Sequence, residues 1–130
     1  MNTEENKSAV FGYHLMVDLY GCDNEKINSL DFCYQFLDEL PSKIQMDKQS
    51  PPFLFRSPEN YPGKAGLSGW VPLIQSGMSI HTLIDTGFVS VDVYSCLCFD
   101  KDFVTSMILD YFPSTSHEVN YLKRGIHYFD

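Results

Sequence analysis

Residues 69–98, GWVPLIQSGMSIHTLIDTGFVSVDVYSCLC, hold three apolar, strand-like runs separated by short connections that contain glycine. Ser76-Gly77 separates the first pair of runs, and Asp85-Thr86-Gly87 separates the second pair. Glycine in such a connection supplies the positive φ that tight turns between antiparallel strands need. The stretch therefore predicts two consecutive hairpins, with strands over residues 69–75, 78–84 and 88–98.

The segment before this stretch predicts a strand and a helix. Residues 10–20 alternate between apolar and mixed side chains, as a half-buried strand does. Apolar residues then recur at three- and four-residue steps over residues 27–40, with Asp23 or Asn24 as the N-cap and Pro41 as the end of the helix. A short apolar run over residues 53–55 and a loop rich in glycine and proline over residues 57–69 follow.

The segment after the hairpins predicts a second helix and a last strand. Asp100 is the expected N-cap, and the last strand is expected over residues 118–122. The inner stripe of this helix is expected to hold Phe103, Val104, Met107, Ile108 and Tyr111. Few helices among many hairpins are typical of an α+β fold. We therefore expect a single domain over residues 1–130, a two-layer sandwich with a mainly antiparallel sheet and two main helices on one face.

Composition excludes some partners and favours others. The chain has nine basic and 17 acidic residues, and its net charge of −8 argues against a nucleic acid partner. A cationic small substrate is compatible with this charge, as is plain solubility. Residues 1–8 are polar and form no signal core, and no stretch has the ~20 apolar residues of a membrane helix, so a cytoplasmic location is expected. In that compartment the four cysteines are expected to be free thiols, with no metal site.

The second hairpin also predicts which residues face each other. If Asp85-Thr86 centres the turn, Cys96 lies opposite Gln75, and Ser76 lies opposite Ser95. His81 is five residues from Ser76, which is ~17 Å of extended chain. The chain would have to bend at Ser76-Gly77 to bring this imidazole back to Ser76.

Two blocks of sequence resemble a known family. One is HLMVDLYGCD over residues 14–23. The other comprises LSGW over residues 67–70, QSGMSIHT over residues 75–82 and GFVSVDVYSC over residues 87–96. In this order and spacing they resemble the bacterial class of S-adenosylmethionine decarboxylases, which are made as proenzymes.

The resemblance implies that the chain cuts itself between Gln75 and Ser76 and that Ser76 becomes a pyruvoyl cofactor. The products would be a β chain of residues 1–75 and an α chain of residues 76–130. Ser68 and His81 would assist processing, with His81 as the base for an elimination step. Cys96 would donate a proton after carbon dioxide leaves. The pyruvoyl carbonyl would form a Schiff base with the substrate amine and act as an electron sink.

Several positions depart from the family pattern and bear on the substrate. Gln75 replaces a common glutamate, Asp18 replaces glutamate, and Gly77 replaces a bulkier residue. Asp18 is expected to help hold the cationic part of the substrate, and Tyr61 or Phe55 to stack on adenine. The implied substrate is S-adenosylmethionine, as a source of the aminopropyl donor for spermidine.

Two alternatives stay open from the sequence. One is decarboxylation of another amine, ornithine or arginine, and the other is a paralogue that binds a ligand without processing. Members of the family pair sheet to sheet, so a homodimer is also expected.

Overall fold

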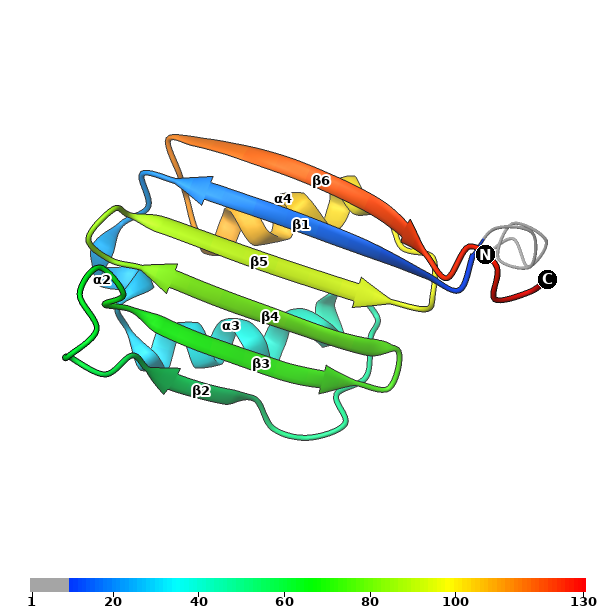
Figure 1. Cartoon of the computed structure of the whole chain (residues 1–130), viewed down its shortest axis with the longest axis horizontal. Coiled ribbons are helices and arrows are strands. Elements are labelled where there is room, and N and C mark those ends of the chain that lie inside the picture. The colour runs from blue at the N-terminus through cyan, green and yellow to red at the C-terminus, as the bar shows by residue number, and fades with distance from the viewer. Residues whose placement is uncertain (1–9) are drawn as a thin grey trace.

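The computed structural model describes residues 10–130, so the polar segment over residues 1–8 lies outside the described residues. Six strands form one antiparallel sheet in the order β2-β3-β4-β5-β1-β6, and the helices cover one of its faces (Figure 1). The strands are β1 (Gly12–Tyr20), β2 (Phe53–Arg56), β3 (Leu67–Leu73), β4 (Ser76–Leu83), β5 (Phe88–Ser95) and β6 (Ser116–Arg124). The helices are α2 (Asn24–Ile27), α3 (Leu30–Lys43) and α4 (Lys101–Tyr111). The predicted α+β sandwich is confirmed.

The core lies between the helices and one face of the sheet. Alternate residues of β1, β4 and β5 point into it, and Leu15, Val17 and Val91 are at most 1% exposed. From the helical side, Phe36 of α3 and Ile108 of α4 are completely buried. Each such side chain stabilises the fold by about 1.5–3 kcal/mol. This packing fixes the sheet, and the sheet in turn places the polar residues of its other face.

The first predicted helix is two helices, and it does not end at Pro41. Asp23 accepts a hydrogen bond from the Glu25 amide and begins α2, while Ser29 accepts one from the Phe32 amide and begins α3. The apolar stripe crosses this break without interruption, and for that reason periodicity alone did not reveal it. Pro41 lies inside α3, where the helix continues to Lys43.

Helix α4 begins after Asp100 as predicted, but its inner stripe is narrower than expected. The Asp100 carboxylate accepts hydrogen bonds from the amides of Asp102 and Phe103. Val104 and Ile108 are buried, whereas Phe103 is 50% exposed. The expected place of Phe103 in the core was therefore wrong, because it lies in the first turn, at the rim of the helix layer.

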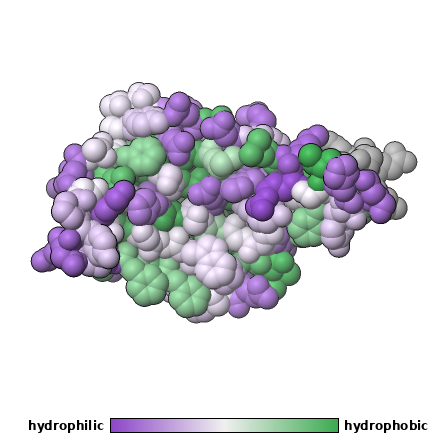
Figure 2. Space-filling model, viewed as in Figure 1, coloured by the Kyte–Doolittle hydropathy of each residue, from purple (hydrophilic) through white to green (hydrophobic). Residues whose placement is uncertain are grey.

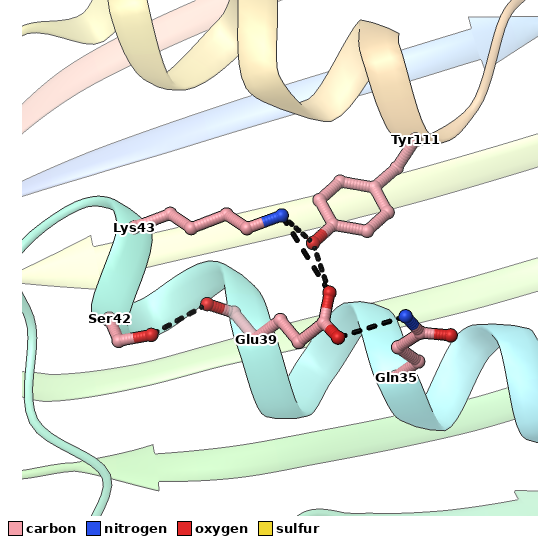
Figure 3. Close-up of polar contacts among 5 residues, drawn as sticks. All are labelled: Gln35, Glu39, Ser42, Lys43 and Tyr111. Atoms are coloured by element: carbon pink, nitrogen blue, oxygen red, sulfur yellow. Dashed lines mark hydrogen bonds and ion pairs between the residues drawn. The ribbon is translucent and has the colours of Figure 1, made fainter.

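A polar network joins α3 to α4 (Figure 3). The Tyr111 hydroxyl donates a hydrogen bond to Glu39 Oε1 at 2.8 Å and accepts one from Lys43 Nζ at 2.7 Å. Gln35 Nε2 donates to the other carboxylate oxygen of Glu39 at 2.8 Å. Hydrogen bonding from Gln35 and Tyr111 lowers the pKa of Glu39. The hydrogen bonds of Tyr111 thus join α4 to α3 within the helical layer.

No helix of residues 10–130 covers the other face of the sheet. Figure 2 shows it as a mixture of hydrophilic and hydrophobic side chains, with hydrophobic rings near the edge formed by β2. We call this surface the open face. Its side chains come from the alternate positions that point away from the core, and they include His14, Asp18, Phe53, Phe55, Ser68, Trp70, Ser79, His81, Asp92 and Tyr94.

Candidate active site

The bond predicted to be cut lies at the hairpin end between β3 and β4. The Cys96 amide donates a hydrogen bond of 2.9 Å to the Gln75 carbonyl oxygen, and Ser76 pairs with Ser95. The predicted register of the second hairpin is therefore confirmed. A hydrogen-bond donor on this carbonyl polarises it towards attack by a nucleophile. Ser76 is the next residue, so a hydroxyl and a polarised carbonyl adjoin the same peptide bond.

Ser76-Gly77 is not the turn that the sequence predicted. Leu73 pairs with Ser76, so Ile74 and Gln75 make the connection and Ser76 is the first residue of β4. Gly77 lies under the indole of Trp70, and a Cβ there would be 2.9 Å from Trp70 Nε1. Gly77 is therefore a place of close packing against Trp70, not part of a turn.

A second group of polar side chains lies farther along β3 and β4, away from Ser76. Ser68 of β3 pairs with His81 of β4, and Ser68 Oγ is 2.8 Å from His81 Nδ1. Strand β4 runs without interruption from Ser76 to Leu83, so the bend considered at Ser76-Gly77 is absent. His81 consequently stays ~17 Å along the strand from Ser76 of its own chain.

Asp18 and Tyr61 lie towards the His81 end of the sheet. Asp18 pairs with Ser90, and Ser90 pairs with His81, which places Asp18 two strands from the imidazole in one cross-strand row. Burial raises the pKa of the Asp18 carboxyl, and so do the nearby charges of Glu118 and Asp92. Tyr61 is 60% exposed in the loop that leads into β3. The candidate residues thus form two groups at opposite ends of β3 and β4.

An open cavity of about 500 Å³ lies beside Ser76 on the open face. Its lining residues are His14, Trp70, Ser76, Gly77, Met78, Ser79, Asp92 and Tyr94. Asp92 Oδ1 is 3.0 Å from His14 Nε2, and its other oxygen accepts a hydrogen bond from Ser79 at 3.3 Å. Aromatic rings and a carboxylate around one cavity suit a cationic ligand.

Sequence reasoning did not assign Trp70, Asp92 or Tyr94 to the site. The confirmed hairpin register could have indicated two of them, because it sets Tyr94 opposite Gly77 and Asp92 opposite Ser79. Extending that register along both strands would have placed these side chains on the face that carries His81. Trp70 carries no such signal, since its position depends on the first hairpin, whose turn was misplaced.

The cysteines differ in their suitability for chemistry. Burial raises the pKa of Cys33 to about 12, so its thiol is a structural group in the core. Cys96 is partly exposed and directly follows the last residue of β5. Ser95 Oγ accepts a hydrogen bond of 3.0 Å from the Leu97 amide, which turns the chain away from the sheet just after Cys96. Of these two thiols, Cys96 is the one beside the candidate bond.

Comparison with solved structures shows the class of fold. The chain superimposes on the adenosylmethionine decarboxylase from Aquifex aeolicus VF5 with a TM-score of 0.78 and 28% sequence identity, over 91% of this chain and 93% of that one. The α+β sandwich is thus the fold of a decarboxylase.

Comparison of sequences gives the family. The family model for S-adenosylmethionine decarboxylase matches residues 13–125. S-adenosylmethionine decarboxylase proenzyme 2 of Halalkalibacterium halodurans is 30% identical over 116 residues, covering 88% of this chain and 87% of the relative. The proenzyme of Thermococcus onnurineus is 32% identical over 116 residues, covering 88% of this chain and 78% of the relative. The chain belongs to the S-adenosylmethionine decarboxylase family.

Proposed function

We propose that this chain is a proenzyme that cuts itself between Gln75 and Ser76 and then decarboxylates S-adenosylmethionine with a pyruvoyl group formed from Ser76. The product would be the aminopropyl donor for spermidine synthesis. The observation that carries the proposal is the hydrogen bond from the Cys96 amide to the Gln75 carbonyl, next to the Ser76 hydroxyl. Membership of the family supports the same reaction.

The residues at the hairpin end suit the chemistry of self-cleavage. Ser76 Oγ attacks the Gln75 carbonyl carbon, the peptide C–N bond opens, and an ester joins the two residues. Removal of the Ser76 α-proton then expels the Gln75 carboxylate from Cβ. Water replaces the remaining nitrogen, which leaves as ammonia. The Cys96 amide stabilises the oxygen that becomes negative in the first step.

The cavity beside Ser76 suits the substrate. A pyruvoyl group at this position would supply an electron-withdrawing carbonyl for the decarboxylation. Trp70 and Tyr94 offer aromatic faces to a sulfonium or ammonium group, and Asp92 offers a negative charge. The Cys96 thiol, next to the cut bond, would return a proton to the substrate carbon.

The base for the elimination step would come from a second copy of the chain. His81 lies too far along its own strand to reach Ser76, yet it is held by Ser68 on the open face. A two-fold axis parallel to that face and perpendicular to the strands would place the Ser68–His81 pair of one copy over the Ser76 end of the other. This arrangement supports a homodimer with two sites, each built from both protomers.

The same pairing would bring substrate-binding groups to the site. Asp18, in the cross-strand row of His81, would add negative charge for the cationic part of the substrate. Phe53, Phe55 and Trp70 line an apolar hollow of about 410 Å³ beside Ser68. A flat adenine ring fits such a surface. Tyr61, on the loop that leads into β3, would close over it.

Intact-mass analysis of the purified protein tests the proposal. We expect two fragments, residues 1–75 and residues 76–130, with a pyruvoyl group blocking the second. Ser76→Ala should remain one uncut chain. Carbon dioxide release from S-adenosylmethionine, ornithine and arginine then identifies the substrate. A wild-type chain that stays uncut would exclude the enzyme and favour a ligand-binding paralogue.

A further inference from the structure

A short segment after α3 runs beside the hairpin end that holds the bond to be cut. Lys48 forms an isolated antiparallel bridge with Leu73, and the Gln49 amide donates to the Pro72 carbonyl at 2.8 Å. The Ile74 amide in turn donates to the Asp47 carbonyl at 2.9 Å. The segment therefore extends the pairing of β3 on the side away from β4.

The chain is directed to this place by its own local structure. Gln45 has a φ of 62°, the left-handed conformation that redirects the backbone after α3. Met46 is only 4% exposed and anchors the segment in the core. Its amide donates to the Pro41 carbonyl at 2.8 Å. Asp47 follows directly, so its position relative to the hairpin is set by a buried neighbour.

The Gln75 side chain makes two hydrogen bonds with Asp47, one to its backbone and one to its side chain. The Asp47 amide donates to Gln75 Oε1 at 3.0 Å, and Gln75 Nε2 donates to Asp47 Oδ2 at 3.2 Å. With the bond from Ile74, Asp47 makes three hydrogen bonds to the two residues of the connection. The Gln75 carbonyl is held from the other side by the Cys96 amide. Gln75 is therefore held both through its side chain and through the carbonyl of the peptide bond that precedes Ser76.

We propose that Asp47 is a positioning residue for self-cleavage, holding Gln75 so that its carbonyl carbon faces the Ser76 hydroxyl. The inference rests on the proposed cut at Gln75–Ser76. Asp47 touches no reacting atom and acts only through Gln75. Attack within a chain depends steeply on alignment, since a displacement of about 1 Å can cost on the order of a hundredfold in rate.

The proposal can be tested by exchanging the carboxylate of Asp47 and the amide of Gln75. The Gln75 side-chain amide accepts one hydrogen bond from Asp47 and donates another. A carboxylate in its place could accept but could not donate. Gln75→Glu would set two carboxylates against each other. Adding Asp47→Asn to that variant would restore a donor facing an acceptor, with the two groups reversed.

The experiment follows the uncut precursor over time by intact mass after a pulse of cell-free synthesis. We expect Asp47→Ala and Gln75→Glu to slow cleavage by roughly tenfold to a hundredfold. Asp47→Asn keeps an oxygen that accepts from Gln75, so it should cleave close to the wild-type rate. The double variant Asp47→Asn/Gln75→Glu should recover most of the rate that Gln75→Glu loses.

Asp38→Ala is the matched control. Asp38 forms an ion pair with Lys48 in the same segment but makes none of the hydrogen bonds that join Asp47 to the hairpin connection. It should cleave at the wild-type rate. To separate positioning from folding, Ser76→Ala and Ser76→Ala/Asp47→Ala, which both stay uncut, should melt at the same temperature.

Three results would overturn the inference while leaving the proposed function intact. They are normal cleavage of Asp47→Ala, an equal slowing by Asp38→Ala, and failure of the double variant to recover. If the wild-type chain itself is not cut, the proposed function fails first, and that outcome is visible before any variant is compared.

Discussion

The two ends of strand β4 carry different parts of the candidate machinery. At the Ser76 end, the bond predicted to be cut has an amide that polarises its carbonyl, but His81 lies at the far end of the strand. At the other end there is an imidazole held by a serine hydroxyl, but no bond to cut. The described part of one chain therefore holds the expected groups at two separate places along β4.

The strongest change in cleavage should appear when the two ends of β4 are supplied by different chains. A dimer of two His81→Ala chains should lack the base at both of its Ser76 residues, and Ser76→Ala has no serine to process. When the two variants are co-expressed with distinct tags, the His81→Ala chain should be cut, because its Ser76→Ala partner supplies an intact Ser68–His81 pair. Mass analysis identifies which chain is cut.

Co-expression of His81→Ala with the double variant Ser76→Ala/His81→Ala is the control, and it should give no cutting. Rapid cleavage of His81→Ala alone would show that His81 is not the base. An uncut His81→Ala chain inside a demonstrated mixed dimer would exclude the contribution of the second copy.

The next effect separates two roles at the Ser76 end. Cys96→Ala keeps the backbone amide that polarises the Gln75 carbonyl, so self-cleavage should continue. It removes the thiol, so decarboxylation should fall by about 10²-fold or more, the usual contribution of a positioned acid. The measurements are fragment mass and carbon dioxide release. Cys98→Ala is the matched control and should retain turnover; equal turnover in Cys96→Ala would remove that thiol from the mechanism.

A smaller effect is expected in the helical layer, which both ends of β4 share. Tyr111→Phe removes the hydroxyl that joins Glu39 to Lys43. The free energy of unfolding should fall by about 1 kcal/mol. Chemical unfolding of the uncut Ser76→Ala chain with and without this change measures it. Cleavage at Gln75–Ser76 should proceed normally, and a marked slowing would show that the helical layer controls the site.

The smallest effect concerns Asp18 at the His81 end. Because its pKa is raised in the folded chain, the ionised carboxylate costs stability above that pKa. Asp18→Asn should therefore raise the free energy of unfolding slightly near pH 7, by less than roughly 0.5 kcal/mol. The gain should shrink as pH falls towards the ordinary value of 3.8, where both states bind the proton. A gain that grows on acidification would contradict the direction of this shift.

The sequence predicted the part of the site that rests on one hairpin. Asp85-Thr86-Gly87 defined a turn, and counting outward from it along both strands was enough to place Cys96 opposite Gln75. The first hairpin was misplaced because glycine was assigned to a turn. Gly77 instead packs closely against the ring of Trp70, a contact between strands that local patterns do not encode.

Other features were beyond prediction from one sequence for physical reasons. The break between α2 and α3 leaves the apolar stripe intact, so it has no periodic signature. Asp47 lies 28 residues from Gln75 in an irregular segment, and only the folded chain brings them together. The place where His81 acts is harder still, because the expected contact is made between two molecules.

The order of the strands determines what a cut between Gln75 and Ser76 would do to the sheet. Residues 1–75 contribute β1, β2 and β3, and residues 76–130 contribute β4, β5 and β6. In the sheet the strands of the two fragments are interleaved, because β1 of the first fragment lies between β5 and β6 of the second. A cut at Gln75 therefore leaves two interleaved peptides that share three strand-to-strand ladders. Unfolding would release separate molecules, so refolding of the cut form would become a concentration-dependent assembly, whereas each uncut chain folds its own sheet as one molecule.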